Sequence, residues 1–349
     1  MSIDLRTDYL GLELANPLVP SASPLSRKLD TARALEDAGA SALVMYSLFE
    51  EEIEAEERAF EELDAWAATH AEAGGYLPVH PDYRSRLDAY LEQLARLKSA
   101  LDIPLVASLN GVTDSGWLEH SRDLQQAGAD ALELNIYYVA ANIAESAAAV
   151  EQRYLDIVRH VKKEVSIPVC VKLGSQFTSP VHFIKQLELA GADGVALFNR
   201  FYQPDLELTS LDVTPTLTLS SPHEALLRMH WIGILHGRVD LTLAATGGIH
   251  EAPQVIKLLL AGADVTHLCA TLLTHGPAQL GEIKRQLCRW MEDNEYESVR
   301  QLKGSVSQLH ARDPSAFERA NYLEVLERYE PPLAVRADLE TPDESPDRC

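Results

Sequence analysis

Cysteine is scarce in this chain, and its spacing does not suit the structures that cysteine clusters build. The 349 residues include four cysteines, all far apart in sequence, and no Cys-x-x-Cys pair occurs. This spacing argues against a disulfide framework, a zinc finger or an iron–sulfur cluster held by this chain. We therefore expect no metal site and a protein of a reducing compartment.

Basic residues and long apolar runs are also in short supply. Lys and Arg number 30 against 53 Asp and Glu, so the formal net charge is −23. Such a charge repels phosphate backbones and anionic lipids, and we expect neither nucleic acid nor a membrane as a partner. No stretch approaches ~20 apolar residues, and residues 1–6 lack the pattern of a secretory leader. These absences predict a cytoplasmic protein.

A short motif with Ala-Gly-Ala at its centre occurs four times. The copies occupy residues 37–41, 126–130, 189–193 and 260–264. Each copy ends a helical pattern and precedes a short apolar run. This order is typical of a left-handed glycine after a helix, followed by a strand buried in a parallel sheet.

Eight strands are predicted in all, near residues 18, 44, 106, 133, 170, 196, 243 and 267. Helical patterns separate most of them, for example at 83–99, 150–164 and 181–189. Eight β-then-α units favour an α/β fold of the (β/α)8 TIM-barrel type over an open doubly wound sheet. No Gly-x-Gly-x-x-Gly follows a strand, so a dinucleotide-binding Rossmann unit has no support.

Other segments decorate this barrel. We expect an N-terminal hairpin at 4–15 that closes the barrel bottom. Long insertions follow strands two and six: one contains an acidic helix (50–62) and a loop (74–81), and the other spans 199–222. Both emerge at the face where barrel enzymes keep their active sites. The expected organisation is a barrel over 1–300, a C-terminal helical extension over 301–330 and a flexible acidic tail over 331–349.

Small residues follow predicted strands seven and eight, in Ala245-Thr-Gly-Gly-Ile249 and Cys269-Ala-Thr271. Backbone N–H groups at these two points can approach a phosphate closely, and a helix start after strand eight favours an anion. The sequence therefore predicts a phosphate site at Gly247, Gly248, Ala270 and Thr271.

A lysine ends predicted strand five inside an apolar run, Val169-Cys-Val-Lys-Leu173. We expect Lys172 to point into the barrel mouth, where a charged group needs a partner. It could hold the anionic ring atoms of a cofactor, or form a Schiff base in an aldolase-like site.

Polar and aromatic residues follow other strands at the same end. Asn135 and Asn199 end strands four and six, and their amides suit the edge of a heterocycle. Ser23 and Ser47, after the first two strands, are weaker candidates. Four tyrosines lie at this end and could stack on a ligand or simply fill the barrel mouth: Tyr46, Tyr137, Tyr138 and Tyr202. We treat the acidic run at 50–57 and the 12 histidines as structural or surface residues.

These residues together resemble the dihydroorotate dehydrogenase family, FMN-dependent (β/α)8 barrels of pyrimidine biosynthesis, over roughly residues 3–300. The likeness is strongest in Asn16-Pro-Leu-Val-Pro-Ser-Ala-Ser23, Glu133-Leu-Asn135, Pro168-Val-Cys-Val-Lys-Leu173 and Ala245-Thr-Gly-Gly-Ile249 with Ala270-Thr271. It implies an FMN oxidoreductase acting on a CH–CH bond. It also implies cofactor-binding residues Ala22, Ser23, Ser47, Asn135, Lys172, Asn199, Gly247, Gly248, Ala270 and Thr271, with Lys172 at the flavin's pyrimidine edge.

The substrate side departs from the family. The family's loop after strand four reads Asn-x-Ser-Cys-Pro-Asn or a Ser variant, and its Cys or Ser is the catalytic base. Here the loop is Asn135-Ile-Tyr-Tyr-Val-Ala140, so Tyr138 stands in the base position and Ala140 replaces a substrate-binding Asn. A phenol with a pKa near ~10 is a better acid than base at neutral pH, so Tyr138 suits proton delivery.

Three hypotheses remain open from the sequence. The first is an FMN oxidoreductase for dihydroorotate or a related small substrate, with Tyr138 and Lys172 as catalytic residues. The second is a flavin-binding protein with little turnover that serves a redox complex. The third is a Schiff-base barrel that uses Lys172. A homodimer and a redox partner protein are compatible with the first two.

Overall fold

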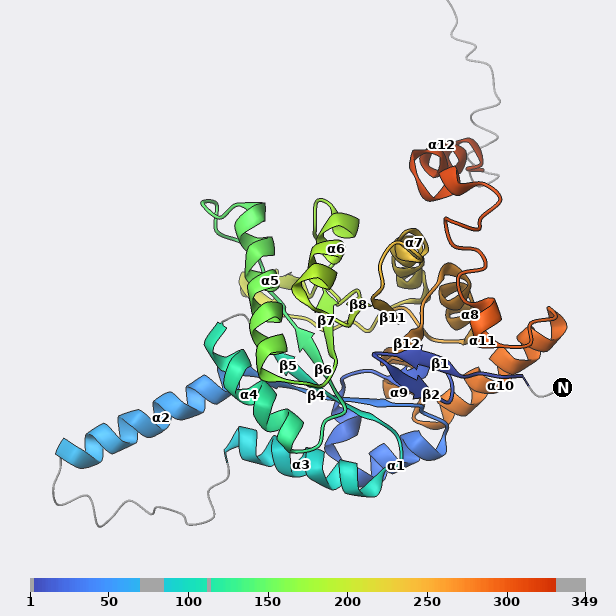
Figure 1. Cartoon of the computed structure of the whole chain (residues 1–349). Coiled ribbons are helices and arrows are strands. Elements are labelled where there is room, and N and C mark those ends of the chain that lie inside the picture. Colours follow the sequence, from blue (N-terminus) through green and yellow to red (C-terminus); the bar gives the residue numbers. More distant parts are fainter. Residues whose placement is uncertain (1–2, 70–84, 112–113, 331–349) are drawn as a thin grey trace, which may run out of the picture.

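The computed structural model describes residues 3–69, 85–111 and 114–330, and it contains a barrel of parallel strands wrapped by helices (Figure 1). Eight strands pair in the order β3-β12-β11-β8-β7-β6-β5-β4. Their bounds are β3 (Leu18–Pro20), β4 (Leu43–Phe49), β5 (Leu105–Asn110), β6 (Ala131–Asn135), β7 (Val169–Leu173), β8 (Gly194–Leu197), β11 (Thr242–Thr246) and β12 (Val265–Leu268). The predicted α/β TIM-barrel fold and the eight strand positions are confirmed.

The two outer strands of this order, β3 and β4, meet through one serine. Both the backbone N–H and the hydroxyl of Ser41 donate to the carbonyl of Leu18, at 3.1 and 3.0 Å. These bonds join the start of β4 to β3, and the sheet is nearly closed as a barrel.

The repeated Ala-Gly-Ala motif forms the same turn at the N-terminal ends of four strands. Its glycine has φ between +102° and +123°, the left-handed region in which only glycine is unstrained. In three copies the closing aspartate bonds the preceding strand twice, through its backbone N–H and its carboxylate. The pairs are Asp130 with Leu105, Asp193 with Val169 and Asp264 with Leu243. Each carboxylate also pairs with a lysine, so these turns fix where the strands begin.

A small hairpin closes the interior at this same end, as predicted for 4–15. It consists of β1 (Thr7–Tyr9) and β2 (Leu12–Leu14), joined by a two-residue turn with positive φ at Leu10 and Gly11. Tyr9, Leu10 and Leu14 are buried among inward residues of the barrel such as Val44 and Val106. In the described part of the chain the lower half of the barrel is therefore solid core, and a ligand cavity can form at the other end.

Helices cover the outside of the sheet, and their apolar faces form one core with the outward side chains of the strands. Their bounds are α1 (Leu29–Asp37), α3 (Arg86–Ala100), α4 (Asp114–Gln126), α5 (Ala147–Glu164), α6 (Pro180–Ala190), α7 (Ala225–Leu235), α8 (Ala252–Ala261), α9 (Ala270–His275) and α10 (Ala278–Asp293), with short 3-10 turns η1 (Pro24–Arg27) and η3 (Pro222–Glu224). The helices predicted at 150–164 and 181–189 are α5 and α6. The helix predicted at 83–99 is α3, and the first two residues of that range lie outside the described part.

Both predicted insertions add structure of their own. After β4, α2 (Glu50–Thr69) projects outward from the barrel (Figure 1). After β8, β9 (Pro204–Glu207) and β10 (Asp212–Pro215) form an antiparallel hairpin. The C-terminal part continues as α11 (Val299–Leu302), η4 (Pro314–Phe317) and α12 (Arg319–Glu327). The loop predicted at 74–81 and the tail predicted at 331–349 lie outside the described residues. Within the described residues, no helix is long and apolar enough to cross a membrane.

Candidate active site

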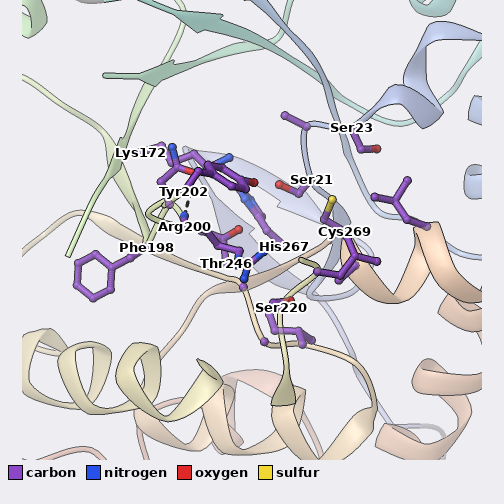
Figure 2. Close-up of a pocket in the computed structure, with 18 of the residues that line it drawn as sticks. Ser21, Ser23, Lys172, Phe198, Arg200, Tyr202, Ser220, Thr246, His267 and Cys269 are labelled. Atoms are coloured by element: carbon purple, nitrogen blue, oxygen red, sulfur yellow. Dashed lines mark hydrogen bonds between the residues drawn. The ribbon is translucent and has the colours of Figure 1, made fainter. Parts of the chain in front are cut away.

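A cavity of about 250 Å³ lies at the carboxyl ends of the barrel strands (Figure 2). Its walls come from the segments after β3, β7, β8, β11 and β12 and from the insertion that follows β8. The predicted site residues that line it are Ala22, Ser23, Lys172, Asn199, Gly247, Gly248 and Ala270. In Figure 2, Lys172 lies across the cavity from Ser23 and Cys269. Residues distant in sequence thus meet where barrel enzymes keep their chemistry.

The glycine turn after β11, Gly247-Gly248, forms one wall of the cavity. Both residues have positive φ, +94° and +77°, a conformation that turns successive N–H groups toward one side. A Cβ on Gly248 would overlap the backbone nitrogen of Ala225 at the start of α7, so packing also demands glycine there. Ala270 faces the same cavity, but α9 has only six residues. A phosphate here would rely mainly on the backbone N–H groups of the turn.

Four predicted residues have polar groups that already bond to protein: Thr271, Ser47, Asn199 and Asn135. The Thr271 hydroxyl donates to the carbonyl of His250 at 2.9 Å, and the Ser47 hydroxyl lies 2.9 Å from that of Ser108. The Asn199 amide donates to the Asn135 side-chain oxygen at 2.7 Å, which ties the ends of β6 and β8 together. Thr271 and Ser47 support the walls, whereas Asn199 faces the cavity with Asn135 behind it.

Lys172 and His267 line the floor of the cavity, and Glu133 lies against both of them beneath it; we call these three side chains the floor cluster. Lys172 Nζ lies 3.3 Å from Glu133 Oε1, and both side chains are buried. The other oxygen, Oε2, lies 3.7 Å from Nδ1 of His267, which is fully buried and lines the cavity. Among the described residues, Glu133 Oε2 and both ring nitrogens of His267 have no hydrogen-bond partner. Burial lowers the pKa of His267 to about 4, so its ring is neutral at pH 7.

Two arginines lie beside the glycine turn. Arg200 lines the cavity and its Nε donates to Glu224 at 3.2 Å, while its Nη1 donates to the Thr218 carbonyl. Arg228, on α7, is buried and lies 3.9 Å from the same carboxylate. Two guanidinium groups share one carboxylate, which leaves an excess of positive charge near the turn. This charge favours an anionic ligand group at that end of the cavity.

Tyr138 lies in a smaller pocket next to the cavity, and its hydroxyl is already bonded. It donates to Glu145 at 2.5 Å, and Arg153 bonds the other oxygen of that carboxylate at 2.6 Å. The Arg153 guanidinium also stacks over the Tyr138 ring, 4.2 Å from its centroid. Asn199 and Arg200 line both pockets, so the two spaces are neighbours. The hydroxyl of Tyr138 must leave Glu145 to reach a ligand in the larger cavity.

Comparison with known proteins identifies the family. A family description, dihydroorotate dehydrogenase, matches residues 83–291, more than half of the chain. The chain belongs to the dihydroorotate dehydrogenase family. Within this dihydroorotate dehydrogenase fold, the matched segment includes the floor cluster, the glycine turn and Asn199.

Several relatives match almost from end to end. The catalytic subunit of dihydroorotate dehydrogenase B (NAD(+)) from Shouchella clausii is 27% identical over 311 residues, 86% of this chain and 97% of the relative. The subunit of the same name from Thermoplasma acidophilum is 23% identical over 322 residues, 86% and 98% of the two chains. That from Methanothermobacter thermautotrophicus is 22% identical over 307 residues, 86% and 97%. The identity is low, and it extends over most of this chain and nearly all of each relative.

Sequence reasoning missed four residues of this dihydroorotate dehydrogenase-family site: Glu133, His267, Arg200 and Arg228. A weak signal did exist for three of them. Glu133 interrupts the apolar strand Ala131–Asn135, His267 the apolar strand Val265–Leu268, and Arg228 the apolar helix Ala225–Leu235. A polar residue inside a buried element needs a partner or a ligand, and this rule would have selected all three. Cys269 also lines the cavity, but burial raises the pKa of its thiol, which makes it a poor base at neutral pH.

Proposed function

We propose that this protein is an FMN-dependent oxidoreductase that acts on the CH–CH bond of dihydroorotate or a related small dihydropyrimidine. The observation that supports this most is the cavity itself, with a lysine in its floor and a glycine turn in its wall. Membership of the dihydroorotate dehydrogenase family supports the same reaction class. The relatives are named for dihydroorotate, and we extend that substrate class to this chain.

The residues present fit FMN. The glycine turn offers N–H groups to a phosphate, and the excess charge of Arg200 and Arg228 favours the anion there. At the floor, Lys172 offers a cation, and His267 offers ring nitrogens that lack a bond within the described residues. A flavin has an anionic phosphate at one end and a hydrogen-bonding pyrimidine edge at the other, which matches these two walls.

We assign the following roles to the chain's own residues. The backbone of Gly247, Gly248 and Ala270 would bind the phosphate, and Ala22 and Ser23 would cover the ring system. Lys172 would hold the pyrimidine edge. Asn199, held by Asn135, would orient the substrate beside the cofactor. FMN supplies the hydride acceptor, the N5 atom of its ring system.

The proton step belongs to Tyr138 in this proposal. Its hydroxyl already donates to Glu145, and this bond, with that of Arg153, lowers the pKa of the Glu145 carboxyl. The phenol keeps its proton while it donates to Glu145, and it can pass that proton to a product once the hydroxyl turns away from Glu145; a proton from solvent then replaces it. This arrangement favours proton delivery to a product over proton removal from dihydroorotate. We therefore expect slow turnover of dihydroorotate itself.

The ion pair at the floor disfavours the Schiff-base alternative. A lysine nucleophile has to be neutral when it attacks a carbonyl. Lys172 instead forms an ion pair with a buried carboxylate at 3.3 Å, and an attack on a carbonyl would leave that carboxylate buried without its partner. Borohydride trapping with carbonyl substrates should leave Lys172 unmodified.

We also propose that a separate redox protein exchanges electrons with this chain. The relatives are named as catalytic subunits of NAD(+) enzymes, and this sequence has no glycine-rich dinucleotide motif of its own after a strand. A pull-down from cells, followed by electron transfer from the reduced flavin to the captured protein, would test this partner.

The test of the proposed function is cofactor identification followed by anaerobic titration. Purified protein should bind one FMN per chain, and acid-released cofactor should run as FMN on chromatography. Candidate dihydropyrimidines should then bleach the visible absorbance of the oxidised flavin. Bound FAD, or no flavin after reconstitution, would contradict the cofactor assignment. Rapid turnover of dihydroorotate, about 1–10³ s⁻¹, would contradict the divergent substrate site.

A further inference from the structure

The proposed function assigns no role to Glu133, the carboxylate of the floor cluster. It lies on β6, its side chain is wholly buried, and one of its oxygens accepts from Lys172 Nζ at 3.3 Å. A carboxylate at such a depth costs much free energy unless it is paired. Its presence therefore needs a reason beyond packing, and its pairing with Lys172, which lines the cavity, suggests that reason.

The charges at the floor sum to about zero. Lys172 contributes a cation and Glu133 an anion, while His267 is neutral at pH 7 because burial lowers its pKa to about 4. The ring of Tyr9 packs edge-on against His267, with centroids 5.7 Å apart, and closes the cluster from below. A further charge on the cavity wall, Arg200, lies on the segment after β8 and pairs with Glu224 at 3.2 Å.

We propose that Glu133 is a positioning residue that neutralises Lys172 and so keeps the bound flavin a weak electron acceptor. This inference rests on the proposed FMN site. A hydride added to flavin N5 brings two electrons, and the resulting negative charge spreads over N1 and the C2 carbonyl oxygen. A lone lysine at that edge would stabilise the charge strongly. A carboxylate 3.3 Å from the same ammonium offsets much of that attraction, so the reduced flavin passes its electrons on more readily.

Sulfite is the probe that reports this charge without turnover. Its sulfur lone pair forms a bond to flavin N5, the visible absorbance bleaches, and the same N1–C2 edge takes up the negative charge. Sulfite affinity therefore follows the charge of the floor. The variant Glu133→Gln keeps the shape of the side chain and removes its charge. We expect it to bind sulfite about tenfold more tightly than the parent, or better still.

The other variants separate charge from structure. Lys172→Met should weaken sulfite binding because it leaves a lone carboxylate at the floor. The double variant Lys172→Met with Glu133→Gln restores a neutral floor, and its sulfite constant should return to about the parent value. The matched control is Asp193→Asn, which neutralises another carboxylate paired with a lysine, Lys162 at 2.7 Å, at the opposite end of β7. It should stay within about twofold of the parent.

Several outcomes would overturn the inference. Equal sulfite constants for the parent and Glu133→Gln would show that Glu133 does not set the charge felt by the flavin. Should Glu133→Gln fail to fold, the comparison of Lys172→Met with the double variant decides, and equal constants there refute the idea. A parent protein that binds no FMN refutes the proposed function first. A parent that binds FMN but shows none of these differences refutes this inference alone.

Discussion

Replacing Arg228 with methionine should loosen the glycine turn from beneath. The Arg228 guanidinium donates to three backbone carbonyls: Thr246 at 2.9 Å, Phe198 at 3.1 Å and Glu224 at 2.9 Å. These carbonyls belong to the ends of β11 and β8 and to the start of α7. The guanidinium also lies directly under Gly247, where a Cβ would come within 2.8 Å of its Nη2. One side chain therefore holds three separate segments of the cavity wall.

The loss of stability can be worked out from these contacts. A hydrogen bond to a charged group contributes about 1.5–3 kcal/mol, and removing one partner of a buried charged network costs about 3–5 kcal/mol. The three bonds share one cation, so their energies do not add. We expect Arg228→Met to lower the free energy of unfolding by about 3–5 kcal/mol. At an unfolding entropy near ~2.1 cal/mol/K per residue, the Tm of a chain of this size should fall by about 4–7 °C.

Thermal unfolding followed by circular dichroism measures this shift, and FMN retention on a desalting column measures the effect on the turn. The control is Arg285→Met, because Arg285 is 72% exposed in its ion pair with Glu282. Such a surface change should move Tm by no more than about 1 °C. An Arg228→Met protein with the Tm and flavin content of the control would mean that the three carbonyls do not depend on this guanidinium.

Three further changes probe other parts of the site. The pKa of His267 is near 6.5 in the unfolded chain and about 4 in the folded protein, so the unfolded chain binds more protons as the pH falls from 6.5 to 4. The folded protein should therefore lose about 2–3 kcal/mol of stability over this pH range. Urea midpoints measured against pH should change less for His267→Gln than for the parent. Gly248→Ala should lower the free energy of unfolding by at least ~2 kcal/mol more than Gly276→Ala. Both glycines have φ near +77°, but a Cβ would overlap Ala225 only at Gly248. Equal Tm values for the two variants would contradict this. The Tyr138→Phe variant should still take electrons into its flavin, but it should deliver the proton ~10²–10⁴-fold more slowly than the parent. Stopped-flow measurement of the reduction of the true substrate gives this rate. A rate equal to that of the parent would mean that Tyr138 only packs in the site.

The barrel strands could be predicted from the sequence because their signals are local. Each Ala-Gly-Ala turn combines a helix end, a left-handed glycine and an apolar strand within about ten residues. Lys172 and Asn199 were also predictable, because a polar residue at the end of a buried strand has to face the barrel mouth. These positions follow from the order of residues along single elements.

The remaining site residues depend on partners far along the chain. Arg228 owes its place to carbonyls of two strands, and His267 to a carboxylate on β6. Neither partner is visible from the neighbouring residues, so both looked like parts of apolar elements. The direction of the Tyr138 hydroxyl depends on Glu145 in the following loop, and loop conformations of this kind are set by tertiary contacts.

Four matching turns at the N-terminal ends of the strands make this barrel suited to recombination. Wherever the motif occurs, successive βα units meet through the same glycine geometry, and in three of the four through the same aspartate bonds. A chain joined at Gly128, Gly191 or Gly262 to another barrel with the same turn would keep its strand starts in register. The loops at the opposite end of the strands, which include the hairpin of β9 and β10 and the Tyr138 segment, would each be replaced as a complete loop. Substrate preference can therefore diverge in this fold while the register of the barrel stays the same.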